Sequence, residues 1–169
     1  SFSSSFFLSA ASSSSTPGFF STIWQSSYSE LSRNWFNPPG PRLSRAEWNG
    51  ILRAAEQNLA RASSLVLSGS PPRGVPVSAY AQLIRLAHRF CVKTLLDCDG
   101  PAFEAAIKAR PFLVKPNEHE LAQWWRKPLR SEAKLVRAAR ALSEQPRGWV
   151  LVSRGAKRGL LVNCAEGFQ

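Results

Sequence analysis

The spacing of apolar positions changes repeatedly along the chain after residue 36. Short, nearly continuous apolar runs predict five strands: "SLVLS", "VKTLLDC", "FLV", "GWVLVS" and "LLVN". Before and between them, segments with apolar residues on one helical face predict helices at residues 44–62, 78–90, 99–110, 117–125 and 131–145. This alternation is typical of an α/β fold, in which a mainly parallel sheet is covered by helices on both faces.

Polar cap residues support the predicted helix starts. Ser44, Ser78, Asn117 and Ser131 precede four of the helices. Glu47 and Glu120 each stand three residues after a cap, which is the spacing of a capping box. Lys134 has the same spacing from its cap but lacks the carboxylate, so the last box is incomplete.

Residues 1–36 have a different composition. "SFSSSFFLSAASSSSTPGFF" is rich in serine and phenylalanine, and no charge occurs before Glu30. It shows neither a helical nor a strand period, and it lacks the basic start of a signal peptide. We interpret residues 1–36 as a disordered or out-of-frame segment, and residues 37–169 as one core-forming domain.

The charge of the chain leaves several partners open. Twenty-two Lys and Arg residues against 11 Asp and Glu give a net charge of +11. Such an excess fits a nucleic acid or a phosphorylated ligand, or has no functional meaning, and the basic residues are scattered. No apolar run approaches the length of about 18 residues that spans a membrane.

Three cysteines form no C-x-x-C pair. Cys91 and Cys98 lie in or beside apolar runs, where a reduced, buried thiol is expected, and Cys164 lies near the end. This usage predicts a reducing, cytoplasmic compartment. The chain begins with serine and contains no methionine, so we expect a fragment of a longer protein.

In open parallel sheets, ligands bind beyond the carboxyl ends of the strands. Gly69 and Ser70 follow the first strand, where glycine allows close backbone approach and serine offers a hydroxyl. After the third strand, "KPNEHEL" either caps a helix or surrounds a nucleotide phosphate and its Mg²⁺. "SRGAKRG" is a glycine turn between two strands, of a kind that sometimes binds phosphate through backbone amides.

Taken in order, these segments resemble a known family. "LVLSGSPPRG", "LLDCDG", "VKPNEHEL" and "VLVSRGAKRG" are similar to the S-G-S-L-P-x-G, D-[TS]-S-G, K-P-N-x-x-E-L and V-S-x-G-A-x-G motifs of phosphofructokinase B (ribokinase-like) carbohydrate kinases. Within that family, the likeness is to the 1-phosphofructokinase and tagatose-6-phosphate kinase type. The resemblance covers residues 37–163 and implies a three-layer, ribokinase-like, Rossmann-type fold, here truncated at both ends.

The resemblance implies an ATP-dependent kinase that phosphorylates a sugar phosphate such as fructose 1-phosphate or tagatose 6-phosphate. By this correspondence, Gly69 and Ser70 contact the sugar. The expected nucleotide-binding residues are Lys115, Asn117, Ser153 and Gly155. Glu120 is expected to support Mg²⁺ through water. The family also implies a homodimer for the full-length parent.

The chain departs from the family pattern at several positions. Pro71 replaces the usual leucine, and Arg158 replaces the second glycine of the phosphate turn, which costs on the order of 1 kcal/mol if φ there is positive. The G-A-G-D motif with the catalytic aspartate and the family's N-terminal segments find no match. We therefore assign no catalytic residue and expect the chain alone to be inactive. The alternatives are a basic α/β nucleic-acid-binding module and a decayed, non-functional reading frame.

Overall fold

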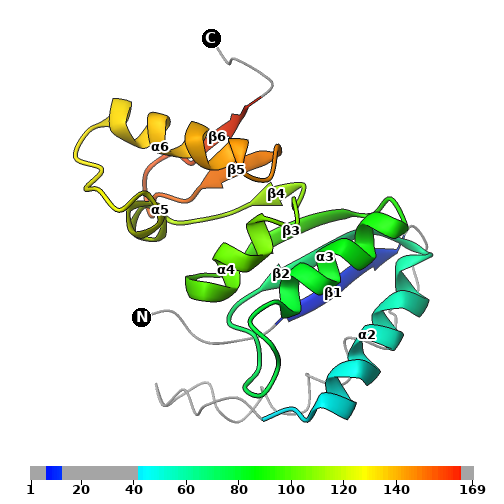
Figure 1. The fold of residues 1–169 in the computed structure, drawn as a ribbon. Helices are drawn as coiled ribbons and strands as arrows, with labels where there is room; N and C mark the ends of the chain where they lie inside the picture. Colours follow the sequence, from blue (N-terminus) through cyan, green and yellow to red (C-terminus); the bar gives the residue numbers. More distant parts are fainter. Residues whose placement is uncertain (1–6, 13–41, 165–169) are drawn as a thin grey trace.

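The computed structural model describes residues 7–12 and 42–164 (Figure 1). Its six described strands are β1 (Phe7–Ser12), β2 (Ala62–Ser68), β3 (Lys93–Asp97), β4 (Leu113–Val114), β5 (Trp149–Val152) and β6 (Leu160–Asn163). They form one sheet in the order β1-β2-β3-β4-β5-β6. Strands β2 to β5 are parallel, whereas β1 and β6 pair antiparallel at the two edges. All five predicted strands are therefore present.

Strand β1 differs from the sequence-based prediction. Residues Phe7–Ser12 belong to the segment interpreted as disordered, yet they form a strand that pairs with β2 from Phe7↔Ser68 to Ser12↔Ala62. An edge strand is recruited by backbone hydrogen bonds, which leave little trace in a serine-rich sequence. The interpretation of that region is wrong at Phe7–Ser12. Residues 1–6 and 13–41 lie outside the described part, and the proposed boundary at residue 36 stays a prediction.

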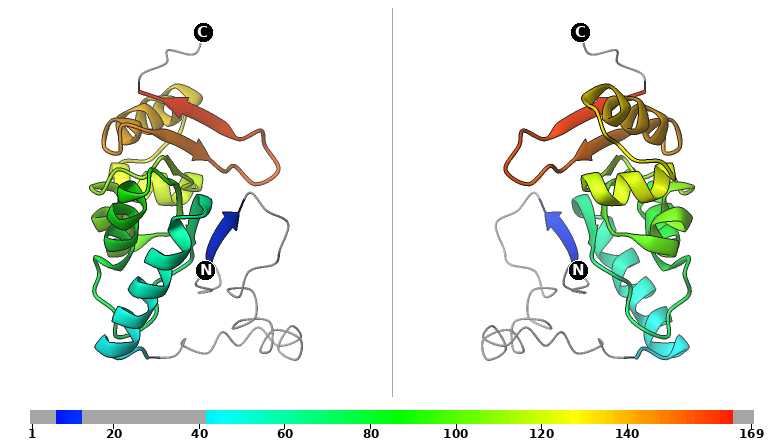
Figure 2. Two further views of the ribbon diagram at one scale, coloured as in Figure 1. Left: turned by 90° about the vertical axis from the view of Figure 1, so that its right-hand side faces the viewer. Right: turned by 90° about the vertical axis from the view of Figure 1, so that its left-hand side faces the viewer.

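The helices are α2 (Arg45–Leu59), α3 (Ala79–Arg89), α4 (Gly100–Ile107), α5 (Glu118–Trp125) and α6 (Glu132–Glu144). Consecutive parallel strands lie side by side in chain order, so right-handed crossovers place the connecting helices on the same face of the sheet. Figure 2 shows α2, α3, α4 and α6 gathered on one side. The α/β class and the parallel central strands are as predicted. Of the three expected layers, the described residues form the sheet and one layer of helices.

Burial alternates along the strands. The row of paired residues that faces the helices is fully buried: Leu67, Leu96, Val114 and Val150. The neighbouring row faces the other side and is only partly buried, although it is equally apolar: Val66, Leu95, Leu113 and Trp149. On that side Phe112 and Leu161 are 39% and 44% exposed. The sequence of the strands is thus suited to burial on both faces.

The helix starts mostly agree with the predicted caps. Capping boxes are present at Ser44 with Glu47 and at Asn117 with Glu120, and Ser131 accepts a bond from the Lys134 backbone. Ser78 precedes α3, but its side chain makes no cap bond, and its hydroxyl oxygen instead accepts from the side-chain Nε2 of Gln82. The predicted cap Asn117 therefore starts helix α5, directly after β4 and at the end of the K-P-N segment.

Candidate functional site

The carboxyl ends of four parallel strands form one continuous row of backbone contacts. The amide of Gly69 donates to the carbonyl of Asp97 (2.8 Å), and the amide of Lys115 donates to the carbonyl of Leu96 (2.8 Å). The amide of Ser153 donates to the carbonyl of Pro116 (2.9 Å). The structure therefore brings the predicted sugar-side and nucleotide-side residues to one edge of the sheet, as the sequence predicted.

On the sugar side, the loop after β2 begins at Gly69. Gly69 has a φ of 80°, a conformation that glycine adopts without steric cost. The fully buried Tyr80 of α3 places its hydroxyl 2.8 Å from the carbonyl oxygen of Gly69 and 3.2 Å from that of Ser68. Ser70, which the resemblance also assigns to the sugar, is half-buried in the same loop. The sequence did not indicate Tyr80, because the loop after β2 separates it from Gly69 and the two residues meet only in the folded chain.

Between the two sides, Lys115 and Asp97 form an ion pair. Lys115 Nζ lies 3.0 Å from Asp97 Oδ2, and the two side chains are 39% and 37% exposed. Lys115 is thus held at the end of β4 by the neighbouring strand. Next to this pair, Cys98 is buried, and burial raises the pKa of its thiol, with Asp99, Asp97 and Glu120 adding to the effect. Cys98 is therefore a protonated packing residue, whereas Cys91 is exposed, contrary to its predicted burial.

On the nucleotide side, Asn117 and Glu120 complete the first turn of α5. The amide of Asn117 donates to Glu120 Oε2, and the amide of Glu120 donates to Asn117 Oδ1, both at 2.9 Å. Asn117 also forms a parallel bridge with Ser153. The capping interpretation is thus confirmed. Capping is compatible with a role in phosphate and Mg²⁺ binding, because the half-buried Glu120 uses only one of its two carboxylate oxygens in the box.

Titratable side chains near the strand ends bear on metal binding. Within residues 7–12 and 42–164, no group of three or more His, Cys, Asp or Glu side chains is arranged to hold a metal ion. Mg²⁺ does not require such a group, because it keeps several waters and usually binds one or two carboxylates together with substrate phosphates.

The turn between β5 and β6 carries the predicted phosphate-binding residues. Gly155 has a φ of 58°, and a side chain there would meet no atom within 4 Å. The turn is therefore open on the side where a Cβ would lie. Arg158 is not among the described residues with positive φ, so the strain considered for arginine at this position does not arise.

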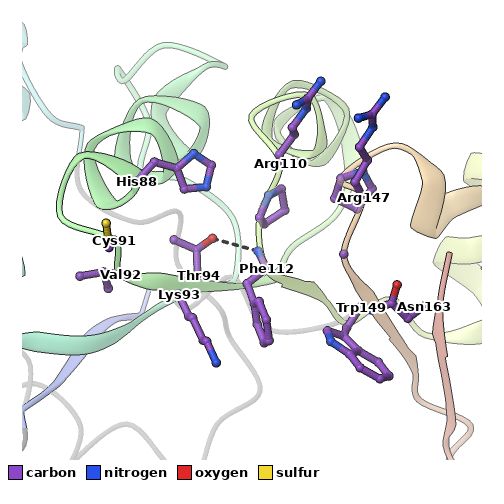
Figure 3. A pocket seen from close by; sticks show the side chains of 13 residues that line it. His88, Cys91, Val92, Lys93, Thr94, Arg110, Phe112, Arg147, Trp149 and Asn163 are labelled. Carbon is purple, nitrogen blue, oxygen red and sulfur yellow. Dashed lines mark hydrogen bonds between the residues drawn. The ribbon is translucent and has the colours of Figure 1, made fainter. Parts of the chain in front are cut away.

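A separate hollow of about 460 Å³ lies at the opposite edge of the sheet (Figure 3). Its lining includes three cationic residues, Lys93, Arg110 and Arg147, and also His88. Arg110 and Arg147 follow the ends of α4 and α6, where cations interact favourably with the helix dipole. This clustering has a structural explanation, and none of the residues predicted for the site lies there.

Comparison with known proteins decides the family. The chain matches the pfkB family of carbohydrate kinases over residues 33–168, which is more than half of its length. The chain belongs to this family. It is 37% identical over 130 residues to a 1-phosphofructokinase of Xanthomonas campestris, and 33% identical over 124 residues to that of Haemophilus influenzae. These matches cover 75% and 73% of this chain but 41% and 40% of those proteins, so it spans about two-fifths of their length.

Solved structures of two kinases share this fold. Phosphofructokinase-2 from Escherichia coli in complex with fructose-6-phosphate superposes with a TM-score of 0.67 at 29% identity, covering 78% of this chain and 44% of that one. Ribokinase from Arabidopsis thaliana, complexed with ribose and ATP, shares the fold at a TM-score of 0.55 and 21% identity. The family match favours a carbohydrate kinase over a nucleic-acid-binding module. In the described part of the chain, no helix is long and apolar enough to cross a membrane.

Proposed function

We propose that this chain is part of an ATP-dependent kinase that transfers a phosphoryl group to a hydroxyl of a sugar phosphate. The observation that carries the proposal is the row of strand ends, in which Gly69 is joined through β3 and β4 to Ser153 by backbone hydrogen bonds. The curated relatives that are most informative are 1-phosphofructokinases. They support fructose 1-phosphate as the acceptor, and tagatose 6-phosphate is the alternative that the sequence resemblance implies.

Each side of the row has a distinct role in the proposal. Gly69 and Ser70 contact the sugar, and the Gly69 carbonyl accepts a hydrogen bond from the Tyr80 hydroxyl. Lys115 and Asn117 lie toward the nucleotide. The Ser153 hydroxyl and the Gly155 amide offer donors to its phosphates, because the Ser153 amide already donates to the Pro116 carbonyl. Phosphoryl transfer depends mainly on positioning and charge neutralisation, and donor amides, a lysine and a helix start supply both.

Mg²⁺ would neutralise phosphate charge near Glu120. Only one Glu120 oxygen is engaged in the capping box, so the other is available to accept a hydrogen bond from a metal-bound water. Among the described residues we assign no general base, so we expect nucleotide binding without measurable transfer by the chain alone. The homodimer and the cytoplasmic location remain predictions.

Titration calorimetry with MgATP, followed by a coupled assay with fructose 1-phosphate, tests the proposal. We expect binding of MgATP that is lost when Mg²⁺ is chelated, and no turnover. The absence of nucleotide binding, together with DNA binding that persists at about 0.2 M salt, would replace the kinase proposal with the nucleic-acid module. Turnover by this chain would show that the expected inactivity is wrong.

A further inference from the structure

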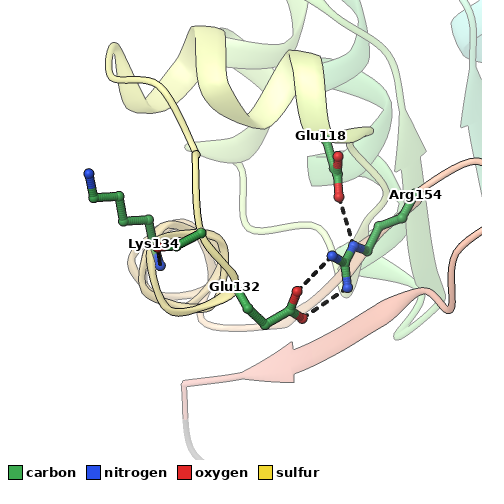
Figure 4. Close-up of polar contacts among 5 residues, drawn as sticks. Glu118, Glu132, Lys134 and Arg154 are labelled. Atoms are coloured by element: carbon green, nitrogen blue, oxygen red, sulfur yellow. Dashed lines mark hydrogen bonds and ion pairs between the residues drawn. The ribbon is translucent and has the colours of Figure 1, made fainter.

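Arg154 lies in the glycine turn and is bound by two carboxylates (Figure 4). Its Nε donates to Glu118 Oε1 at 2.7 Å. Its two terminal nitrogens donate to the two oxygens of Glu132, at 2.9 and 2.7 Å. The Arg154 side chain is only 14% exposed, although the turn itself is on the surface. Lys134, which is near in sequence to Glu132, points away from this cluster (Figure 4).

The three partners come from three different segments. Arg154 directly follows Ser153, Glu118 directly follows Asn117 as the first residue of α5, and Glu132 is the first residue of α6. The contacts span 36 and 22 positions of the chain. They lie beside the hydrogen bond from the Ser153 amide to the Pro116 carbonyl. The glycine turn is thus connected to the start of α5 a second time.

An isolated surface ion pair contributes little, because solvent screens it and two side chains must be ordered. Arg154 differs, since its two terminal nitrogens bind one carboxylate with two parallel bonds and its Nε donates to a second carboxylate. All three side chains are therefore fixed in direction. The family motif V-S-x-G leaves this position unspecified, so no role follows for it from the family pattern.

We propose that Arg154 is a positioning residue that, through Glu118 and Glu132, fixes the turn of Ser153 and Gly155 against the first turn of α5. The inference rests on the proposed function, because the two segments it joins are the proposed nucleotide-binding segments. Arg154 itself does not contact the nucleotide in this arrangement, since its guanidinium is already bound by carboxylates. It acts through the placement of the Ser153 hydroxyl and the Gly155 amide.

The charges of the cluster allow geometry to be separated from electrostatics. Two carboxylates and one guanidinium leave a net negative charge beside a site for phosphates. If only charge mattered, Glu132→Gln would remove repulsion and tighten nucleotide binding. If positioning matters, Glu132→Gln weakens binding, because the two-bond contact to Arg154 is lost. The two explanations therefore predict opposite signs for one substitution.

The experiment compares Arg154→Met, Glu132→Gln and, as a control, Lys134→Met in the full 169-residue chain. MgATP affinity is measured by calorimetry, and amide hydrogen exchange is followed at residues 117–121 and 153–159. We expect MgATP binding about tenfold weaker for Arg154→Met and about threefold weaker for Glu132→Gln. Exchange should become faster at both segments in both variants. Lys134→Met, which also removes a nearby cation, should leave affinity and exchange unchanged.

Two results would overturn the inference. One is equal or tighter MgATP binding by Glu132→Gln, and the other is unchanged exchange at the two segments in Arg154→Met. If the unaltered chain binds no MgATP, the proposed function fails. The exchange comparison then decides alone whether Arg154 holds the two segments together. Exchange at α3, which lies away from the cluster, reports whether a variant has lost its fold.

Discussion

The hydroxyl of Tyr80 lies 2.8 Å from the carbonyl oxygen of Gly69, so a buried residue of α3 supports the loop that follows β2. Tyr80 has no exposed surface, and Gly69 stands where the chain turns with a φ of 80°. The hydroxyl therefore donates to the Gly69 carbonyl, which the turn has taken out of the hydrogen-bond ladder of the sheet. The loop on the sugar side is fixed from within the core rather than from the surface.

Replacing Tyr80 by phenylalanine tests this support. The change removes one oxygen and leaves the Gly69 carbonyl without that donor, so we expect the free energy of unfolding to fall by about 1–3 kcal/mol. Urea denaturation measures the loss, and amide exchange at residues 69–74 should become faster. Ser143→Ala is the control, because Ser143 is also buried and donates to a carbonyl, that of Arg140, but lies in α6. An equal effect of both variants on the loop would contradict the assignment.

Stability should decline in alkaline solution. Burial raises the pKa of Tyr80 and of Cys98 above their ordinary values of 10.0 and 9.0. In the unfolded chain both groups lose their protons at those ordinary values, whereas in the folded chain they keep them. Ionisation then favours the unfolded state, so the stabilisation is complete below about pH 9 and is lost as the pH rises further.

Denaturation curves between pH 7 and pH 10.5 measure this decline. The double variant Tyr80→Phe, Cys98→Ala removes both ionisable groups and should show a shallower loss above pH 9 than the unaltered chain. Parallel pH profiles for the two proteins would mean that other groups, such as lysines, account for the decline.

The three cysteines should differ in reactivity. Cys91 and Cys164 are exposed, whereas Cys98 is buried and its raised pKa suppresses the reactive thiolate. At pH 8 we expect two thiols to react promptly with a disulfide reagent and the third only after unfolding. Mass spectrometry of the labelled peptides identifies them. Prompt labelling of Cys98 in the folded chain would show that the end of β3 is open.

Lys115→Met separates binding from stability. The Lys115–Asp97 pair is more than one-third exposed on both sides, so its loss should change the free energy of unfolding by less than about 1 kcal/mol. MgATP binding should weaken by about tenfold if Lys115 acts on the nucleotide side as proposed. Lys127→Met removes an exposed cation beyond α5 and serves as the control. Equal MgATP affinities of the two variants would exclude Lys115 from the site.

Two glycines should respond oppositely to alanine. Gly155 has a φ of 58°, so Gly155→Ala should destabilise the turn by about 1 kcal/mol even though space is available. Gly50 lies in the interior of α2, where a Cβ would meet only Arg53 at 4.0 Å, so Gly50→Ala should stabilise by about 0.5–1 kcal/mol. Thermal melts measure both signs. Destabilisation by Gly50→Ala would indicate crowding that the structure does not show.

Local patterns predicted the parallel strands, the capped helix starts and the row of strand ends. Each of these depends on residues close in sequence, such as the box of Asn117 and Glu120 or the apolar run that becomes β3. Tyr80 and Arg154 were not predicted, because their partners are brought together only by the fold. Strand β1 was missed for a related reason, since its pairing with β2 depends on backbone groups that every sequence possesses.

The backbone contacts from Gly69 to Ser153 also set the distance between the sugar side and the nucleotide side of the proposed site. Neighbouring strands lie about 4.8 Å apart, so three steps from β2 to β5 separate the two ends of the row by about 14 Å. No side-chain substitution within the strands can alter this separation while the sheet remains paired. Any adaptation to a longer or shorter pair of ligands must therefore come from the loops at residues 69–78 and 153–159. The strands between these loops determine only that their carboxyl ends lie in one row.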